Sequence, residues 1–95
     1  MTKLSVIIPV YNEEKTIKKV IDKVKRVQLK NITKEIVVVD DFSTDNTRGI
    51  LKNISDKTLK ILFHKKNMGK GAAIRTGINN STGDLIIIQD GDLEY

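Results

Sequence analysis

Four short runs of apolar, mostly β-branched residues are spread along the chain, and each ends at a proline or at polar residues. Runs of this kind are typical of strands buried on both faces of a parallel sheet. They predict four buried strands, over residues 4–8, 35–39, 59–63 and 84–89. Pro9 is expected to close the first of them because it has no backbone N–H to donate.

The segments between the strands carry helical patterns instead. The clearest is an apolar stripe with lysines on the opposite side, made by Ile17, Val20, Ile21 and Val24. It predicts an amphipathic helix that ends near Gln28. Asn12 is expected to cap this helix, with Glu13 and Glu14 in its first turn. Shorter helices are predicted around residues 50–54 and over residues 72–78.

Strands and helices therefore alternate as β-α-β-α-β-α-β in a chain of 95 residues. This order predicts a single α/β domain over residues 1–95, with a mainly parallel, Rossmann-like sheet covered by helices on both faces. Ligands in such sheets lie outside the carboxyl ends of the strands. The residues that follow each strand are therefore the first place to look for function.

An Asp-Gly-Asp sequence, residues 90–92, follows the last strand. Asp90 and Asp92 can project to the same side, because residues i and i+2 of a strand do so, and Gly91 lets a ligand approach closely. Hard cations such as Mg2+ and Mn2+ prefer oxygen ligands and often share them with phosphates. The alternative is a polar turn that merely closes the strand.

Further polar residues follow the other strands. Tyr11 and Glu13 come after the first strand and Asp41 after the second. A carboxylate at Asp41 can accept hydrogen bonds from a base or a ribose; the alternative is a turn or helix-capping acid. Lys70 and Arg75 can face a diphosphate, and the alternative for both is ordinary surface charge. For the single histidine, His64, we expect only a packed or surface position.

Composition narrows the function classes. The formal net charge is +5, but only four aromatic residues accompany the lysines, so nucleic-acid binding is not expected. There is no cysteine and one histidine, which argues against thiolate or histidine metal sites. No run is long enough for a membrane span and no secretory signal follows Met1, so the expected location is cytoplasmic.

The chain resembles the N-terminal half of a family-2 glycosyltransferase, in the branch of dolichol-phosphate mannosyltransferase-like enzymes that act on polyprenyl phosphates. The resemblance covers four blocks in order, at residues 6–14, 37–47, 67–77 and 83–95. One departure is Gly91, where this branch often has alanine. Four blocks in the right order with the right spacing are a specific signal.

The resemblance implies a glycosyltransferase-A fold that binds a GDP- or UDP-linked sugar with Mg2+ or Mn2+. Asp90 and Asp92 match the family's metal motif, and Asp41 would be the principal base contact. The full set of implied nucleotide-sugar-binding residues is Pro9, Tyr11, Glu13, Val39, Asp41, Lys70, Arg75, Asp90, Gly91, Asp92 and Glu94.

The family reaction is inverting transfer of the sugar, here to a polyprenyl-phosphate acceptor at a membrane surface, which would make the protein peripheral on the cytoplasmic face. The catalytic residues and the acceptor-binding half are expected downstream of Tyr95, so we expect this chain to be a fragment with little or no transferase activity. We also expect the fourth strand to leave an uncovered sheet edge, and we hypothesise a homo-oligomer formed through that edge.

Three alternatives stay open on the sequence. One is a nucleotide-binding module without catalysis. Another is a haloacid-dehalogenase-type phosphatase, whose Asp-x-Asp also follows an apolar strand but normally opens the fold. The last is a receiver-like signalling domain, suggested by Asp40 and Asp41, although a receiver would place its phospho-acceptor Asp where Phe63 and His64 stand.

Overall fold

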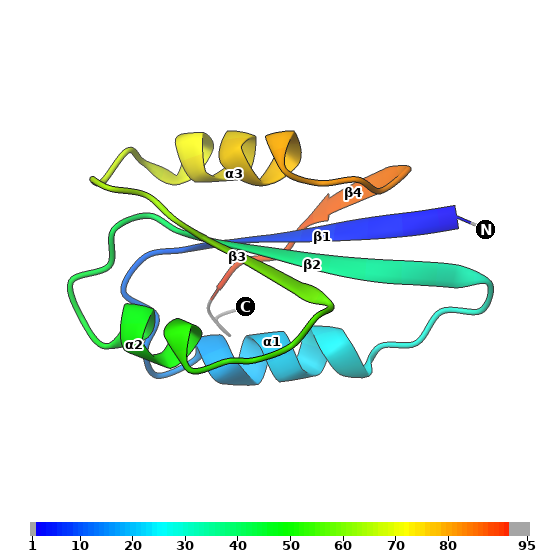
Figure 1. Cartoon of the computed structure of the whole chain (residues 1–95), viewed down its shortest axis with the longest axis horizontal. Coiled ribbons are helices and arrows are strands. Elements are labelled where there is room, and N and C mark those ends of the chain that lie inside the picture. The colour runs from blue at the N-terminus through cyan, green and yellow to red at the C-terminus, as the bar shows by residue number, and fades with distance from the viewer. Residues whose placement is uncertain (1, 92–95) are drawn as a thin grey trace.

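The computed structural model describes residues 2–91. Four parallel strands form one sheet in the order β3-β2-β1-β4, so all four carboxyl ends lie at one edge (Figure 1). The elements are β1 (Thr2–Val10), α1 (Ile17–Arg26), β2 (Ile32–Asp40), α2 (Thr47–Lys52), β3 (Leu59–Phe63), α3 (Lys70–Asn79) and β4 (Leu85–Ile88). The predicted order and the parallel sheet are confirmed.

The central strand β1 runs past the proline that was expected to end it. Pro9 lies opposite Val39 of β2 within the paired part of the strand. The Ile7 carbonyl accepts the last β4-side hydrogen bond, from the N–H of Gln89 at 2.8 Å. Pro9 is two residues further along β1, so its nitrogen also faces the β4 side of the strand. The pairing with β4 has already ended there, so the N–H that Pro9 lacks is not needed for a hydrogen bond between the strands.

Helices cover both faces of the sheet, as predicted: α1 and α2 lie on one face and α3 on the other (Figure 1). The larger core lies under α1 and α2, and the smaller one is formed by Ile7, Val37 and Val39 against Ala73 of α3. Gly77 allows α3 to pack this closely, because a Cβ there would lie 2.5 Å from Cγ2 of Ile7.

The prediction that the fourth strand is buried is wrong. Its residues Leu85, Ile86, Ile87 and Ile88 are 53%, 41%, 50% and 43% exposed. β4 lies at the edge of the sheet, and α3 packs on β1 and β2 rather than over β4 (Figure 1). An apolar run indicates that a strand can be buried, but the elements that pack against the strand in the fold decide whether it is.

The predicted start of the first helix is also wrong. Asn12 has a left-handed backbone, with φ of 53°, and α1 begins only at Ile17, with no acid in its first turn. The carbonyl of Glu13 accepts hydrogen bonds from the N–H groups of Thr16 and Ile17 at 3.1 and 2.8 Å, so a turn precedes the helix. Asn12 is instead used in contacts with the loop after β2.

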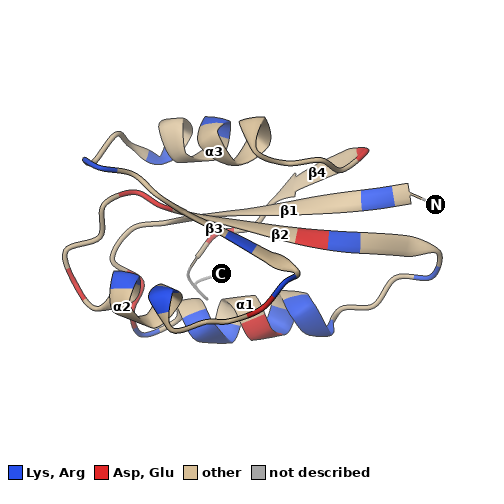
Figure 2. Cartoon of the chain, in the orientation of Figure 1, with Lys and Arg blue, Asp and Glu red and all other residues tan. Residues whose placement is uncertain are grey.

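Charged side chains are spread over several elements (Figure 2). Lys and Arg lie on α1, α2 and α3 as well as on loops and strands, and α1 carries the densest set. Within residues 2–91, no helix has both the length and the apolar content that crossing a bilayer requires.

Candidate functional site

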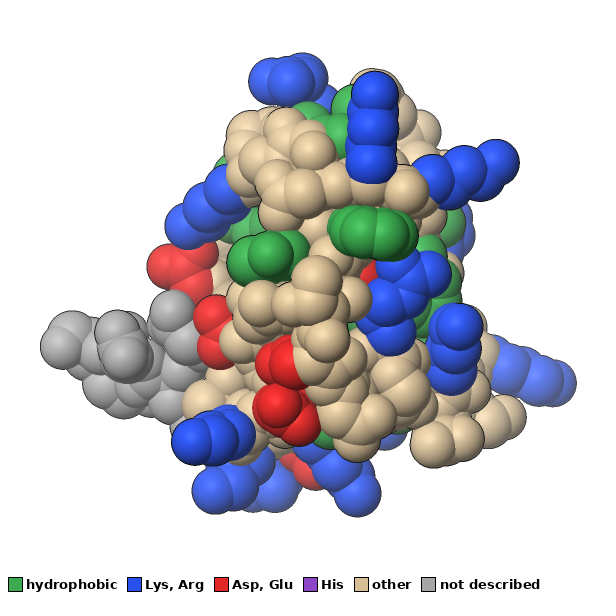
Figure 3. All heavy atoms as spheres, turned by 90° about the vertical axis from the view of Figure 1, so that its left-hand side faces the viewer, with side chains coloured by type: hydrophobic (Ala, Val, Ile, Leu, Met, Phe, Trp, Pro, Cys, Tyr) green, Lys and Arg blue, Asp and Glu red, His purple; other side chains and the backbone are tan. Residues whose placement is uncertain are grey.

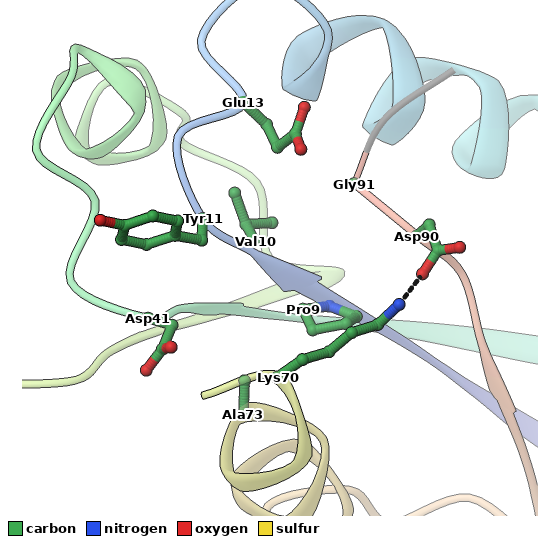
Figure 4. Close-up of a pocket in the computed structure, with 9 residues that line it drawn as sticks. All are labelled: Pro9, Val10, Tyr11, Glu13, Asp41, Lys70, Ala73, Asp90 and Gly91. Carbon is green, nitrogen blue, oxygen red and sulfur yellow. Dashed lines mark hydrogen bonds and ion pairs between the residues drawn. The ribbon is translucent and has the colours of Figure 1, made fainter. Parts of the chain in front are cut away.

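A pocket opens at the carboxyl-end edge of the sheet (Figure 4). Its wall is built from the end of β1 and the loop after it, the residue after β2, the first turns of α3 and the residues after β4. The residues that line it are Pro9, Val10, Tyr11, Glu13, Asp41, Lys70, Ala73, Asp90 and Gly91. Segments far apart in the sequence thus meet at one place because the strands are parallel.

Hydrogen bonds between two loops fix the Tyr11 side of the pocket. The side-chain oxygen of Asn12 accepts the N–H of Thr44 at 2.8 Å, and the N–H of Asn12 donates to Oγ of Ser43 at 2.9 Å. Ser43 is held in turn by Asp40, whose fully buried carboxylate accepts its N–H and its hydroxyl. Tyr11 directly precedes Asn12 in this loop and is 45% exposed, so part of its surface is available to a ligand.

Asp41 is the most strongly held carboxylate at the pocket. Its Oδ1 accepts the N–H of Met68, and its Oδ2 accepts the N–H of Gly69, both at 2.8 Å. Nδ1 of His64 lies 2.8 Å from the same Oδ1. Burial alone would raise the pKa of Asp41, but the hydrogen bonds from His64 and the two N–H groups outweigh it and hold the pKa below its ordinary value of 3.8.

The side chain of Asp41 therefore points toward the segment that leads into α3 (Figure 4). Of the two uses that the sequence left open, the structural one is observed here, whereas contact with a base or a ribose stays a prediction. Asp41 is a loop-anchoring acid, and it also lines the pocket. An ionised carboxylate has about four acceptor positions, and three are taken, so one remains for a ligand.

On the opposite wall, Asp90 is exposed and pairs with a lysine. Its Oδ1 lies 2.7 Å from Nζ of Lys70, and the two side chains are 57% and 63% exposed (Figure 4). Gly91 lies close to β1, since a Cβ there would come within 3.2 Å of the Pro9 carbonyl oxygen. The Gly91 carbonyl also accepts a hydrogen bond from the Thr16 hydroxyl at 3.0 Å.

Seven of the predicted site residues line this pocket, whereas two others do not. Val39 is fully buried beneath it in the core under α3, and Arg75 is exposed on α3 outside the lining. Asp92 and Glu94 lie outside the described residues. Val10 and Ala73 also line the pocket but were not predicted, although Val10 lies next to Pro9 in the chain and Ala73 lies one helical turn from Lys70.

The side chains at this edge of the sheet can be compared with the ligands that a metal ion needs. Within the described part of the chain, no group of three or more His, Cys, Asp or Glu could hold a metal ion. Asp90 supplies one hard oxygen ligand of the kind that Mg2+ and Mn2+ prefer, and it already attracts a cationic group, the Lys70 ammonium. Asp90 therefore fits one position of a site that is shared with a phosphate ligand.

The face that carries the pocket has mixed charge. Acidic side chains lie in its middle and lower part, and Lys and Arg surround them (Figure 3). This arrangement suits a ligand that has both an anionic group and neutral hydrogen-bond donors.

Curated relatives match nearly the whole chain. The undecaprenyl-phosphate 4-deoxy-4-formamido-L-arabinose transferase of Proteus mirabilis is 36% identical over 99% of this chain and 30% of its own length. The dolichyl-phosphate beta-glucosyltransferase ALG5A of Trichomonas vaginalis is 37% identical over 94% of this chain and 30% of its own length. The chain thus spans less than a third of the length of these relatives.

Solved structures of similar sequence show the fold. Residues 1–349 of S. aureus TarS in complex with UDP-GlcNAc superpose with a TM-score of 0.82 at 34% identity, covering 95% of this chain and 26% of that TarS chain. The mannosyltransferase PcManGT of Pyrobaculum calidifontis, in complex with GDP-Man and Mn2+, gives a TM-score of 0.78 at 30% identity, covering 96% of this chain and 28% of that enzyme. The architecture is therefore that of a glycosyltransferase-A fold. The family model for glycosyl transferase family 2 matches residues 5–95, so the chain belongs to glycosyl transferase family 2.

Proposed function

We propose that residues 1–95 form the nucleotide-sugar-binding part of a glycosyltransferase that transfers the sugar of a GDP- or UDP-linked donor by inverting displacement. The observation that carries this proposal is the pocket at the carboxyl ends of the strands, in a chain of family 2. Related structures are described as complexes with UDP-GlcNAc and with GDP-Man. The pocket is lined by an aromatic ring, carboxylates and a lysine, which are groups that can bind a base, a ribose and a diphosphate.

The nucleoside would lie on the wall made by Pro9, Tyr11 and Asp41. A half-exposed Tyr11 ring can stack on a base, and the remaining acceptor position of Asp41 can receive a base N–H. Glu13 would face the ribose, and Val39 would support the pocket from the core beneath.

The diphosphate would lie on the other wall. Lys70 lines the pocket there, and Arg75 lies on the same helix, within reach of an extended ligand. We propose that Asp90 and Asp92 hold Mg2+ or Mn2+, with Gly91 and Glu94 flanking the phosphates. When bound, the cation would stabilise the negative charge that develops on the leaving nucleoside diphosphate. Lys70 would then exchange its partner Asp90 for a phosphate oxygen.

The acceptor would be a polyprenyl phosphate, whose phosphate oxygen is already a nucleophile. It would attack the anomeric carbon while the bond from that carbon to the diphosphate breaks, and the configuration at that carbon would invert. The names of the relatives from Proteus mirabilis and Trichomonas vaginalis, both transferases for lipid-linked phosphates, support this acceptor class. A lipid-linked acceptor would bring the protein to the cytoplasmic face of a membrane.

Calorimetry tests the donor site. UDP, GDP and their sugars are titrated with and without Mn2+, and we expect binding that depends on the metal. Asp90→Ala and Asp92→Ala should each abolish the metal dependence. Asp22→Ala, on α1 and outside the pocket lining, should bind as the unaltered protein does. Metal-independent binding, or beryllofluoride binding without nucleotide binding, would contradict the proposal.

We also propose that the protein self-associates through β4. All four apolar residues of this edge strand are more than 40% exposed, and an uncovered strand edge can pair with another copy. Analytical ultracentrifugation should show a dimer or larger species that Ile87→Lys dissociates. Ile78→Lys is the matched control, because Ile78 is 42% exposed but lies on α3. A monomer at every concentration tested would refute this part.

A further inference from the structure

His64 is a buried histidine that the proposed chemistry does not use. It follows β3 directly, and its side chain is 8% exposed. Three contacts fix it: its backbone N–H donates to the Asp40 carbonyl, Nδ1 meets Oδ1 of Asp41, and Nε2 meets Oγ1 of Thr76, each at 2.8 Å. A ring held at both nitrogens and at its backbone has a single orientation.

The hydrogen on the ring can be placed from the partners. An ionised carboxylate can only accept, so Nδ1 must carry the hydrogen that points to Asp41. The Thr76 hydroxyl can donate or accept, and it therefore satisfies Nε2 in either state of the ring. The direction of the hydrogen bond from His64 to Asp41 is thus fixed, and the chain Thr76–His64–Asp41 ends on a pocket carboxylate.

Without the imidazole N–H, Asp41 would be held only by the backbone N–H groups of Met68 and Gly69. These two come from adjacent residues of one loop, and each binds a different oxygen of the carboxylate. The His64 donor comes from a different strand end and occupies the second acceptor position of Oδ1, which leaves the open position on Oδ2. It also ties that carboxylate through Thr76 to α3, which carries Lys70.

We propose that His64 is a positioning residue for nucleotide recognition: it orients Asp41 so that the one open acceptor position of this carboxylate faces the base of the bound nucleotide. This inference rests on the proposed function, in which Asp41 contacts the base. His64 should therefore affect the affinity for the nucleoside half of the ligand and leave the affinity for the diphosphate half unchanged.

Two conservative variants separate this role from simple packing. The amide nitrogen of asparagine is the same number of bonds from Cα as Nδ1 of histidine, and that of glutamine is the same number as Nε2. His64→Asn therefore keeps a donor for Asp41 and loses the Thr76 contact. His64→Gln keeps the Thr76 contact and loses the donor. Both remove the same ring, so a packing role predicts similar effects.

The binding test uses calorimetry with two probes, both with Mn2+: the nucleoside diphosphate that the unaltered protein binds better, and inorganic pyrophosphate, which has no base. We expect His64→Gln to weaken nucleotide binding about tenfold and His64→Asn to weaken it less than about threefold. Pyrophosphate affinity should be the same in all three proteins. Equal losses in both variants, or a loss for pyrophosphate as well, would overturn the inference.

A second measurement needs no variant. His64 is the only histidine, so its two ring nitrogens give the only imidazole signals in a 15N NMR spectrum. We expect nucleotide binding to shift the Nδ1 signal and pyrophosphate to leave it in place. If nucleotide binds and Nδ1 does not move, the inference is wrong although the proposed function stands. If pyrophosphate binds with Mn2+ and neither nucleotide does, the proposed function fails, and the inference fails with it.

Discussion

Asp41 and Asp90 come after strands β2 and β4 of one parallel sheet, on either side of β1, yet the protein holds them very differently. The Asp41 side chain is 4% exposed and receives three hydrogen bonds, whereas that of Asp90 is 57% exposed and meets the flexible end of a lysine. The first follows a strand paired on both sides, and the second follows an edge strand. The wall of the pocket at Asp41 is thus preorganised, while the contacts on the wall at Asp90 depend on what binds there.

Strands β1 and β4, which lead to the two walls of the pocket, offer the sharpest test of this difference between a buried and an exposed part of the sheet. Ile7 of β1 is fully buried and Ile87 of β4 is 50% exposed. We expect Ile7→Ala to lower the free energy of unfolding by about 3 kcal/mol, because it leaves a cavity between β1 and α3. Ile87→Ala should cost less than about 1 kcal/mol. Urea unfolding measures both, and equal losses would show that β4 is covered in solution.

The two carboxylates themselves give the next largest contrast. Asp41→Asn places an NH2 group against backbone donors, so it should cost about 2 kcal/mol in the free energy of unfolding. Asp90→Asn weakens only an exposed pair and should cost less than about 0.5 kcal/mol. The same urea series measures this. Because the pKa of Asp41 is lowered, the contribution of its ionised form to folding stability is complete above pH 3.8 and is lost as the pH falls further. The free energies of unfolding of Asp41→Asn and of the unaltered protein should therefore converge in acid.

The packing of α3 against β1 can be tested with two glycines on one helix. A Cβ at Gly77 would lie 2.5 Å from Cγ2 of Ile7, whereas one at Gly71 would meet only the end of Arg75, at 3.6 Å. Gly77→Ala should therefore cost about 1–2 kcal/mol through overpacking. Gly71→Ala should stabilise the protein by up to about 1 kcal/mol, because alanine favours the helix. Thermal unfolding that ranks the two variants in the opposite order would contradict this packing.

The features that could be predicted from the sequence depend on local patterns, and those that could not depend on contacts between distant segments. Strands β1, β2 and β3 could be predicted from their apolar runs, and the edge at which their carboxyl ends meet could be predicted from the alternation of strands and helices. Both are local signals. The exposure of β4 depends on which element covers it, and the use of Asn12 depends on a loop more than thirty residues away. The contact between His64 and Asp41 was not predicted, because Asp41 lies 23 residues earlier in the chain. Contacts of this kind become visible only once the strand order is known.

The smallest effect is expected at an exposed ion pair away from the pocket. The side-chain hydrogen bond from Lys25 lowers the pKa of Asp56 to about 2, with a further contribution from Thr58. A lowered pKa stabilises the folded protein above pH 3.8, and this contribution disappears as the pH falls through about 2. Asp56→Asn should therefore give the smallest shift in melting temperature of these variants at pH 7, and that shift should fade as the pH falls through about 2. In a Lys25→Gln background the shift should shrink further, because only the Thr58 contact is left to lose. A shift that is unchanged in that background would show that Lys25 contributes nothing, as many exposed ion pairs do.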